Sequence, residues 1–318
     1  MSATETRRHD EMLQAADRLR RGGLVAFPTE TVYGLGADAT DARAVARVFA
    51  AKGRPAFNPL IVHVGDLAAA ERLAVFDPVA RDLAARFWPG PLTLVLRLAE
   101  GHALAPLVTA GLDTVAIRVP AAPLARDLLA AVGRPVAAPS ANRSGQVSAT
   151  RAAHVREGLG ADVDLVLDGG PCPVGLESTI LRTDPLALLR EGGLAAEAIE
   201  AALGHAVPRD VTPGKVQAPG QLSSHYAPNA AVRLDVVDAE GDAVHIGFGP
   251  VAGDMTLSAT GDVVEAAANL FDMLHRADAL ARARGLARID VAPIPEVGLG
   301  RAINDRLRRA AAPRIAQP

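Results

Sequence analysis

Hydrophobic residues in the first two thirds of the chain form short runs, separated by stretches with apolar residues three or four positions apart. The runs predict strands over residues 24–27, 60–64, 92–98, 114–119, 135–138 and 163–168. The spaced stretches predict helices over residues 10–21, 40–52, 78–87, 123–132 and 150–158. This alternation indicates an α/β domain. Several strands follow one another too closely for a helical crossover, so we expect a mixed rather than a purely parallel sheet.

The pattern changes over residues 208–230, where proline and glycine are frequent and hydrophobic periodicity is weak. This composition is typical of a linker. Beyond it the pattern predicts strands over 231–237, 243–248 and 287–292 and helices over 262–283 and 301–311. We therefore expect a larger domain over residues 1–207, a linker over 208–230 and a smaller α/β domain over 231–318.

Composition argues against several classes of protein. The 318 residues carry a formal net charge of −3, so there is no overall basic footprint for nucleic acid. Aromatic residues are only 3%, too few for stacking platforms for single strands. The single cysteine, Cys172, cannot build a disulfide framework or a cysteine-based zinc site. The polar N-terminus lacks a signal-peptide pattern and no apolar run approaches about 18 residues, so we expect no signal peptide and no membrane span. The single cysteine fits a reducing compartment, and we expect a cytoplasmic location.

Lysine is rare in this chain. Of the 33 lysine and arginine residues only two are lysines, Lys52 and Lys215. Lysine is a compact point charge, whereas arginine is a rigid planar fork. Lys52 stands two residues before Arg54, and this pair suggests an anion held from two directions, with polyphosphate as the natural candidate. An equally good interpretation is that Lys52 only favours the C-terminal dipole of the preceding helix.

A glycine-containing segment, residues 28–39, follows the first predicted strand and is a candidate ligand-binding loop. Gly34, Gly36 and Ala39 formally match the dinucleotide fingerprint G-x-G-x-x-A. The tight strand-to-helix turn of that fingerprint is missing, and no acidic residue stands about 20 positions later for a ribose. We therefore expect no Rossmann dinucleotide site here, and the chain has no Walker A motif.

Two polar side chains interrupt predicted strands. Arg118 lies in the strand 114–119, and a buried arginine needs an anionic partner. A structural carboxylate and a substrate carboxylate are both suitable partners. His63 lies in the strand 60–64, where a lone histidine is more often a core residue than a catalytic one.

The loop over residues 139–145 follows the strand 135–138 and carries hydroxyl and amide groups. Such groups at the C-terminal end of a strand suit a ligand-binding loop, although an ordinary polar loop has the same composition. No G-x-S-x-G elbow occurs, so a serine nucleophile is disfavoured. No cluster of His, Cys and carboxylates has the spacing of metal ligands.

Eight short motifs occur in a fixed order along the chain. They cover residues 28–36, 52–60, 116–120, 139–142, 177–179, 190–192, 225–228 and 298–305. The set resembles the YrdC-like threonylcarbamoyl-AMP synthases, in the long form with an extra C-terminal domain. The resemblance extends over nearly the whole chain, and the joint occurrence is far more specific than any one motif. The stretch 219–224, before His-Tyr-Ala-Pro, departs from the family pattern.

The resemblance implies a twisted mixed-sheet YrdC-like domain with flanking helices, linked to a smaller Rossmann-like α/β domain. It implies a nucleotidyltransferase that makes L-threonylcarbamoyl-AMP and pyrophosphate from L-threonine, bicarbonate or CO2, and ATP. The product would serve threonylcarbamoylation of adenosine 37 in tRNAs that read ANN codons, through a downstream transferase machinery and with no requirement for direct tRNA binding. Such a transfer needs positioning and charge stabilisation rather than a protein nucleophile.

The resemblance also implies residue roles, with Lys52 and Arg54 as the catalytic cations. The residues expected to bind ATP are Lys52, Arg54, Asn58, Thr114, Ser140, Asn142, Ser148, Arg190, Tyr226 and Asn229. Those expected to bind threonine are Thr31, His63, Arg118, Ala138 and Ser178. Tyr226 and Asn229, in the linker, are expected to close over the nucleotide as a lid. Mg²⁺ is expected to arrive on the ATP phosphates, because the motifs contain no dedicated carboxylate ligands.

Two other functions fit part of this pattern. A carbamoyl-transfer maturation factor shares the domain type, but such chains carry an acylphosphatase-like region and cysteine-rich fingers that are missing here. A module that binds double-stranded RNA is the second. The net charge of −3 and the lack of a long basic run argue against RNA as the main ligand, while a local basic patch stays open.

Overall fold

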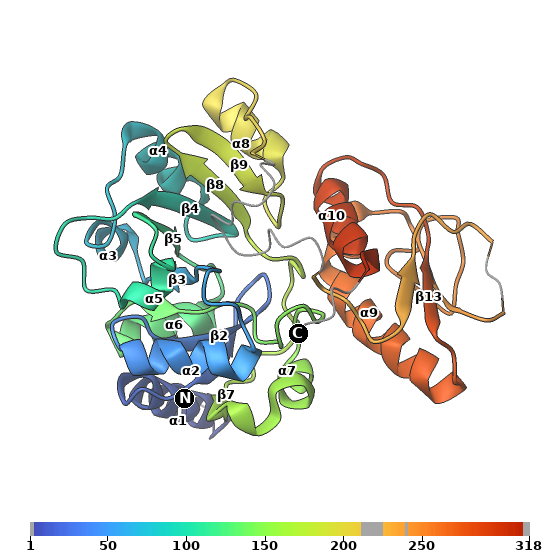
Figure 1. Ribbon diagram of the computed structural model, residues 1–318, viewed down its shortest axis with the longest axis horizontal. Coiled ribbons are helices and arrows are strands. Elements are labelled where there is room, and N and C mark those ends of the chain that lie inside the picture. Colours follow the sequence, from blue (N-terminus) through green and yellow to red (C-terminus); the bar gives the residue numbers. More distant parts are fainter. Residues whose placement is uncertain (1–2, 211–224, 239–240, 314–318) are drawn as a thin grey trace.

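The computed structural model describes residues 3–210, 225–238 and 241–313. Lys215 and most of the predicted linker lie outside these residues. The described chain contains two β-sheets, each accompanied by helices (Figure 1).

The larger sheet unit comes from residues 3–210. Its helices are α1 (Ala3–Arg20), α2 (Ala42–Lys52), α3 (Leu67–Glu71), α4 (Pro78–Phe87), α5 (Pro106–Thr109), α6 (Pro123–Val132), α7 (Ala152–Leu159) and α8 (Ala196–Leu203), with a 3-10 turn at Gly160–Asp162. Its strands are β1 (Val25–Pro28), β2 (Tyr33–Asp38), β3 (Ile61–His63), β4 (Leu92–Arg97), β5 (Thr114–Arg118), β6 (Val136–Ala137), β7 (Leu165–Val166), β8 (Thr179–Thr183) and β9 (Leu186–Arg190).

Within the described residues the larger sheet has nine strands in the order β7-β1-β2-β6-β3-β5-β4-β8-β9. Three neighbouring pairs are parallel, namely β1/β7, β3/β5 and β4/β8, and the others are antiparallel, so the predicted mixed sheet is confirmed. In the parallel pair β3/β5, His63 lies directly opposite Arg118. These two side chains therefore stand at the same end of two neighbouring strands.

Apolar side chains from alternate strand positions enter two different cores. Phe27 packs with Leu19 of α1 and Leu128 of α6. Ala26, the preceding residue of β1, packs instead with the core that includes Val45 of α2. Because successive side chains of a strand point to opposite faces, helices cover both faces of the sheet. This double burial explains the continuous apolar runs in the sequence.

The end of α2 directs the chain toward the pocket described below. Asp41 caps its N-terminus by accepting hydrogen bonds from the N–H groups of Arg43 and Ala44, at 2.8 and 3.2 Å. Gly53 ends the helix in the left-handed conformation, with φ of 58°. Glycine adopts this conformation without steric cost, and Arg54 follows immediately.

Two predictions near the N-terminus are wrong. The first helix begins at Ala3 rather than at residue 10, because its first turns are polar and carry no apolar periodicity. The segment expected to be a glycine-rich loop contains the strand β2. A Cβ atom at Gly36 would lie 2.8 Å from a ring carbon of Phe27, so this glycine allows close packing against β1.

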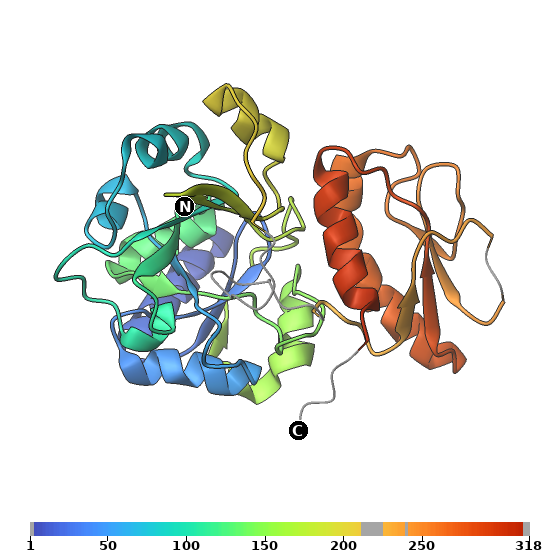
Figure 2. The same cartoon turned by 45° about the horizontal axis from the view of Figure 1, so that its top comes forward.

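The smaller sheet unit comes from the C-terminal residues. Its elements are the strands β10 (Ala231–Arg233), β11 (Val244–Gly247), β12 (Met255–Thr256) and β13 (Arg288–Val291) and the helices α9 (Val263–Arg284) and α10 (Leu299–Ala311). The strands are all parallel, in the order β10-β13-β11-β12, and confirm a smaller Rossmann-like α/β unit. Figures 1 and 2 show α10 on the side of this unit that faces the larger one. Across the described residues, we find no helix long and apolar enough to span a membrane.

Candidate active site

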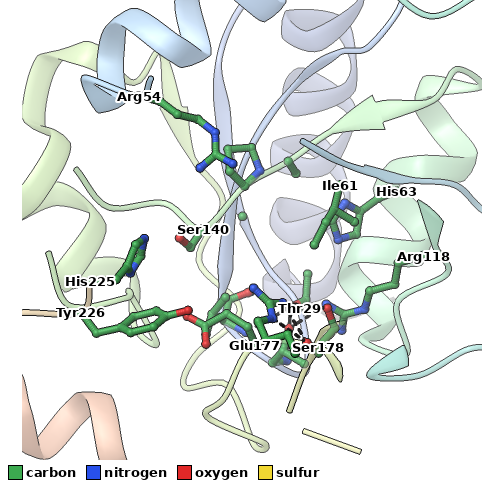
Figure 3. Close-up of a pocket in the computed structure, with 16 residues that line it drawn as sticks. Thr29, Arg54, Ile61, His63, Arg118, Ser140, Glu177, Ser178, His225 and Tyr226 are labelled. Carbon is green, nitrogen blue, oxygen red and sulfur yellow. Dashed lines mark hydrogen bonds between the residues drawn. The ribbon is translucent and has the colours of Figure 1, made fainter. Parts of the chain in front are cut away.

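A pocket lies at one end of the strands of the larger sheet (Figure 3). It is lined by Thr29, Thr31, Val32, Gly34, Arg54, Ile61, His63, Arg118, Ala138, Pro139, Ser140, Glu177, Ser178, Arg190, His225 and Tyr226. Figure 3 shows His63 and Arg118 toward one side of the pocket and His225 and Tyr226 toward the other. Residues that are far apart in the sequence therefore form one concave site.

Lys52 lies directly behind the pocket wall and is 3% exposed. Its ammonium group donates hydrogen bonds to the carbonyl oxygens of Ser140, at 2.6 Å, and of Asn142. The Lys52 carbonyl accepts a hydrogen bond from the Ser144 N–H, at 2.8 Å. Lys52 thus fixes the loop 140–144 against the end of α2, a role that neither interpretation of the sequence included.

Arg54 reaches the pocket with its guanidinium held from behind. It donates to the backbone carbonyl and side-chain Oδ1 of Asn58, at 3.0 and 2.7 Å, and to the Pro59 carbonyl, at 2.6 Å. Asn58 therefore orients Arg54 and does not itself line the pocket.

Three buried cations gather on one side of the site. Burial and the Arg54 charge lower the pKa of Lys52 well below its ordinary value. Burial and the Arg190 charge lower the pKa of Arg54, and burial lowers the pKa of Arg190. Mutual repulsion of this kind is relieved when an anion binds among the cations. The arrangement is therefore suited to a polyanion such as a nucleotide phosphate chain.

Arg118 has a carboxylate partner within the protein. Its guanidinium donates to Glu30 at 2.5 Å, to the Thr31 hydroxyl at 2.8 Å and to the Gly90 carbonyl at 3.0 Å. The second oxygen of Glu30 accepts from the N–H of Ala121, at 3.0 Å. The structural carboxylate considered from the sequence is therefore Glu30, while Arg118 still lines the pocket.

His63 is buried beside Arg118 and also lines the pocket. Within the described structure its Nδ1 has no hydrogen-bond partner. Burial and the Arg118 charge lower the pKa of His63 to about 3, so the ring is neutral near pH 7. A neutral ring with an unpaired nitrogen is suited to contact a polar ligand.

Ser178 lines the pocket and is held by Thr93 and Arg190. Its hydroxyl lies 2.7 Å from the Thr93 hydroxyl. Arg190 donates to the Ser178 carbonyl at 2.8 Å and to the Ser178 hydroxyl at 3.2 Å. The neighbouring residue, Glu177, accepts from the Ser148 hydroxyl at 2.5 Å.

Six of the predicted ligand-binding residues do not line the pocket, namely Lys52, Asn58, Thr114, Asn142, Ser148 and Asn229. Lys52, Asn58 and Ser148 support lining residues, as described above. Thr114 opens β5, at the opposite end of the strand from Arg118. Asn229 donates to Asp278 of α9 at 2.7 Å and lies in a separate groove, which Asn142 also lines.

Some lining residues had no assigned role in the sequence analysis, among them Thr29, Ile61, Glu177 and His225. Glu177 and His225 stand next to Ser178 and Tyr226 in the motifs, and this adjacency was the available signal. Across the described residues, no group of three or more His, Cys, Asp and Glu side chains is placed to hold a metal ion.

Adding a methyl group at Gly192 is expected to disturb the pocket wall. A Cβ atom there would lie 2.4 Å from the Glu177 carbonyl oxygen and 2.5 Å from the carbonyl carbon of Ser178 and the nitrogen of Thr179. Because the obstacle is backbone, we expect Gly192→Ala to lower the unfolding free energy by about 1–3 kcal/mol. Urea unfolding measures this change. Gly158→Ala is the matched control, since no atom lies within 4 Å of its Cβ position, and equal stability of the two variants would contradict the prediction.

Acid is expected to destabilise the protein as the pH falls below about 6.5. Burial lowers the pKa of His63 and His225 to about 3 and that of His275 to about 4. In the unfolded chain these rings bind a proton near pH 6.5, so proton binding favours unfolding between that pH and the lowered folded-state pKa values. At pH 5 each ring is expected to cost about 1–2 kcal/mol of unfolding free energy.

Urea unfolding at pH 7.5, 6 and 5 measures this loss. His275→Gln is expected to reduce the slope of stability against pH, while replacement of the exposed His205 by Gln leaves it unchanged. If the unfolding free energy is the same at pH 7.5 and at pH 5, burial does not keep these histidine rings neutral and the prediction is wrong.

Comparisons with known proteins cover both sheet units. Residues 17–192 match the Sua5_yciO_yrdC family, described as "Telomere recombination", and residues 194–312 match "Threonylcarbamoyl-AMP synthase, C-terminal domain". The chain is 43% identical to a threonylcarbamoyl-AMP synthase of Pyrococcus abyssi, over 95% of this chain and 94% of that protein. It is 41% identical to one of Bacillus subtilis, over 96% and 94%. The crystal structure of P. abyssi Sua5 complexed with L-threonine is similar, with a TM-score of 0.85 at 42% identity over 94% of both chains.

Proposed function

Because the chain belongs to the Sua5/YrdC family of threonylcarbamoyl-AMP synthases, in the form with the family's C-terminal domain, we propose that this pocket condenses L-threonine, bicarbonate or CO2, and ATP. The products are L-threonylcarbamoyl-AMP and pyrophosphate, and the enzyme is a nucleotidyltransferase. The observation that carries the proposal is the division of one pocket into a side with buried cations and a side with Arg118, His63 and Thr31.

The nucleotide occupies the cationic side. Arg54 and Arg190 contact the phosphates, and Ser140 contributes polar groups from the loop that Lys52 holds. Tyr226 covers this side from the linker. Lys52 adds its charge to the phosphate site from behind the wall, and Asn58 keeps Arg54 in place.

Threonine occupies the other side. Its carboxylate is drawn to Arg118, and Thr31, His63 and Ser178 supply polar contacts, with Ala138 in the wall. The similar Pyrococcus protein was crystallised with L-threonine bound, which supports this amino acid as the substrate. A planar guanidinium is well matched to a carboxylate, because it can donate two parallel hydrogen bonds.

The chemistry requires only positioning and charge. The threonine amine adds to CO2 and gives a carbamate with the loss of a proton. A carbamate oxygen attacks the α-phosphorus of ATP, the bond from that phosphorus to the bridging oxygen breaks, and pyrophosphate leaves. Lys52, Arg54 and Arg190 stabilise the negative charge that develops on the phosphates. No protein nucleophile enters the scheme.

Mg²⁺ bound to the ATP phosphates would supply further charge neutralisation. The residues of the site fit a metal delivered in this way. Glu177, the carboxylate among the lining residues, is already engaged by Ser148 and by Arg306 of α10.

The wider setting is also part of the proposal. We assign catalysis to residues 1–207, the linker and lid to residues 208–230, and the smaller unit to residues 231–318. The product passes to a tRNA threonylcarbamoyl-transferase machinery for adenosine 37, and this enzyme has no need to bind tRNA itself. A cytoplasmic location stays a prediction.

The test is an assay of pyrophosphate release with purified protein, ATP, threonine and bicarbonate. We expect release to depend on all three substrates and to fall when bicarbonate is removed. Pyrophosphate release that is independent of threonine would exclude the proposed reaction.

A further inference from the structure

One arginine of the C-terminal unit is completely buried at the junction with the larger unit. Arg306, on α10, has a relative exposure of 0% and is the largest of the fully buried side chains in the described structure. Its Nε donates to Glu177 at 2.9 Å, and one terminal nitrogen donates to the Glu191 carbonyl at 2.9 Å. Its guanidinium carbon lies 5.3 Å from the centre of the Tyr226 ring.

Two of these partners, Glu177 and Tyr226, line the pocket themselves. The third, Glu191, follows the lining residue Arg190. Arg306 comes from a different sheet unit, 129 residues along the chain from Glu177. One side chain therefore contacts three separate segments of the pocket wall.

Arg306 and Glu177 also keep each other charged in a buried environment. Burial alone would lower the pKa of Arg306, but attraction by Tyr226, Glu177 and Asp305 raises it above the ordinary value. Burial alone would raise the pKa of Glu177, but Arg306 and then Arg190 lower it, so the carboxylate stays ionised. A buried carboxylate without its partner would be an uncompensated charge beside the phosphate site.

We infer that Arg306 is a positioning residue through which the C-terminal unit completes the nucleotide site. It neutralises Glu177, so that the cations at the pocket keep their attraction for the ATP phosphates. It also holds the backbone of Glu191 and the ring of Tyr226 in place. The inference rests on the proposed function in naming ATP as the ligand.

The experiment combines substitutions at both members of the pair. Arg306→Met is expected to raise the KM for ATP by about 10-fold or more, and the KM for threonine much less, because the contacts of Arg306 lie on the nucleotide side. Adding Glu177→Gln to Arg306→Met removes the uncompensated charge and should recover most of the affinity for ATP. Arg308→Met is the matched control on the exposed face of α10, where Arg308 pairs with Glu296.

Arg306→Lys keeps a positive charge beside Glu177 but loses the planar fork that reaches the Glu191 carbonyl. Because the carboxylate stays compensated, we expect the KM for ATP to rise less in Arg306→Lys than in Arg306→Met. If Arg306→Met is not recovered as folded protein, Arg306→Lys decides alone, and its KM for ATP should rise more than its KM for threonine. Additive effects of Arg306→Met and Glu177→Gln on the KM for ATP, or a change in Arg306→Lys that is equal for ATP and threonine, would overturn the inference.

The dissociation constant of α,β-methylene-ATP, which cannot release pyrophosphate, separates this inference from the proposed function. If wild-type protein fails to release pyrophosphate but the two substitutions remain coupled in binding this probe, the proposed reaction is wrong and the role of Arg306 stands. If wild-type protein is active and the coupling is absent, the role of Arg306 is wrong.

Discussion

Replacing Lys52 with arginine is expected to lower kcat/KM by at least about 10-fold although the positive charge is kept, and replacing it with methionine by about 10²–10³-fold. The ammonium group is buried and donates to the carbonyl oxygens of Ser140 and Asn142. A lysine ammonium is compact and directs three donors from one atom, whereas a guanidinium is larger and planar. An arginine must therefore displace the loop that carries Ser140.

Steady-state release of pyrophosphate, with ATP and threonine varied separately, measures this effect. Because Ser140 lies on the nucleotide side, we expect the KM for ATP and kcat to change more than the KM for threonine. Arg43→Lys, an exposed position on the same helix, is the matched control and should leave both constants unchanged. Unchanged turnover in Lys52→Arg would show that the shape of the cation is unimportant.

The part of the fold that could be predicted from the sequence follows from local signals. The helices α4 and α6 match the expected ranges 78–87 and 123–132, because proline marks their first positions and apolar spacing is regular. The strand β2 was missed because Gly34 and Gly36 weaken any strand pattern. These glycines have a tertiary function, since Gly36 makes room for Phe27 of the neighbouring strand.

The candidate site, too, could be predicted only where local sequence signals place its residues. Residues at strand ends or in short motifs, such as Arg118, Ser140 and Ser178, do meet in one pocket. Thr114 belongs to the same strand as Arg118, but its position at the other end follows from the strand direction rather than from the motif. Contacts such as Arg306 with Glu177 join distant parts of the chain, and no local pattern encodes them.

Replacing Arg118 with methionine is expected to lower the unfolding free energy by about 3–5 kcal/mol, because it leaves Glu30 buried without its partner. Arg118 and Glu30 have side-chain exposures of 4% and 9%, and water cannot readily compensate the carboxylate. Urea unfolding measures the loss. Arg97→Met, at an exposed position on the adjacent strand β4, is the control and should stay within about 0.5 kcal/mol of the wild type.

Activity of the double variant Arg118→Met/Glu30→Gln separates the two roles that the sequence left open for Arg118. Removing both charges should restore much of the stability, since the uncompensated carboxylate is gone. If Arg118 only balances Glu30, threonine-dependent pyrophosphate release returns together with the stability. If Arg118 also binds the threonine carboxylate, the stable double variant stays deficient, with the KM for threonine raised by about 10²-fold or more and the KM for ATP little changed. We expect the second result, because the guanidinium lines the pocket beside His63 while Glu30 holds it from behind.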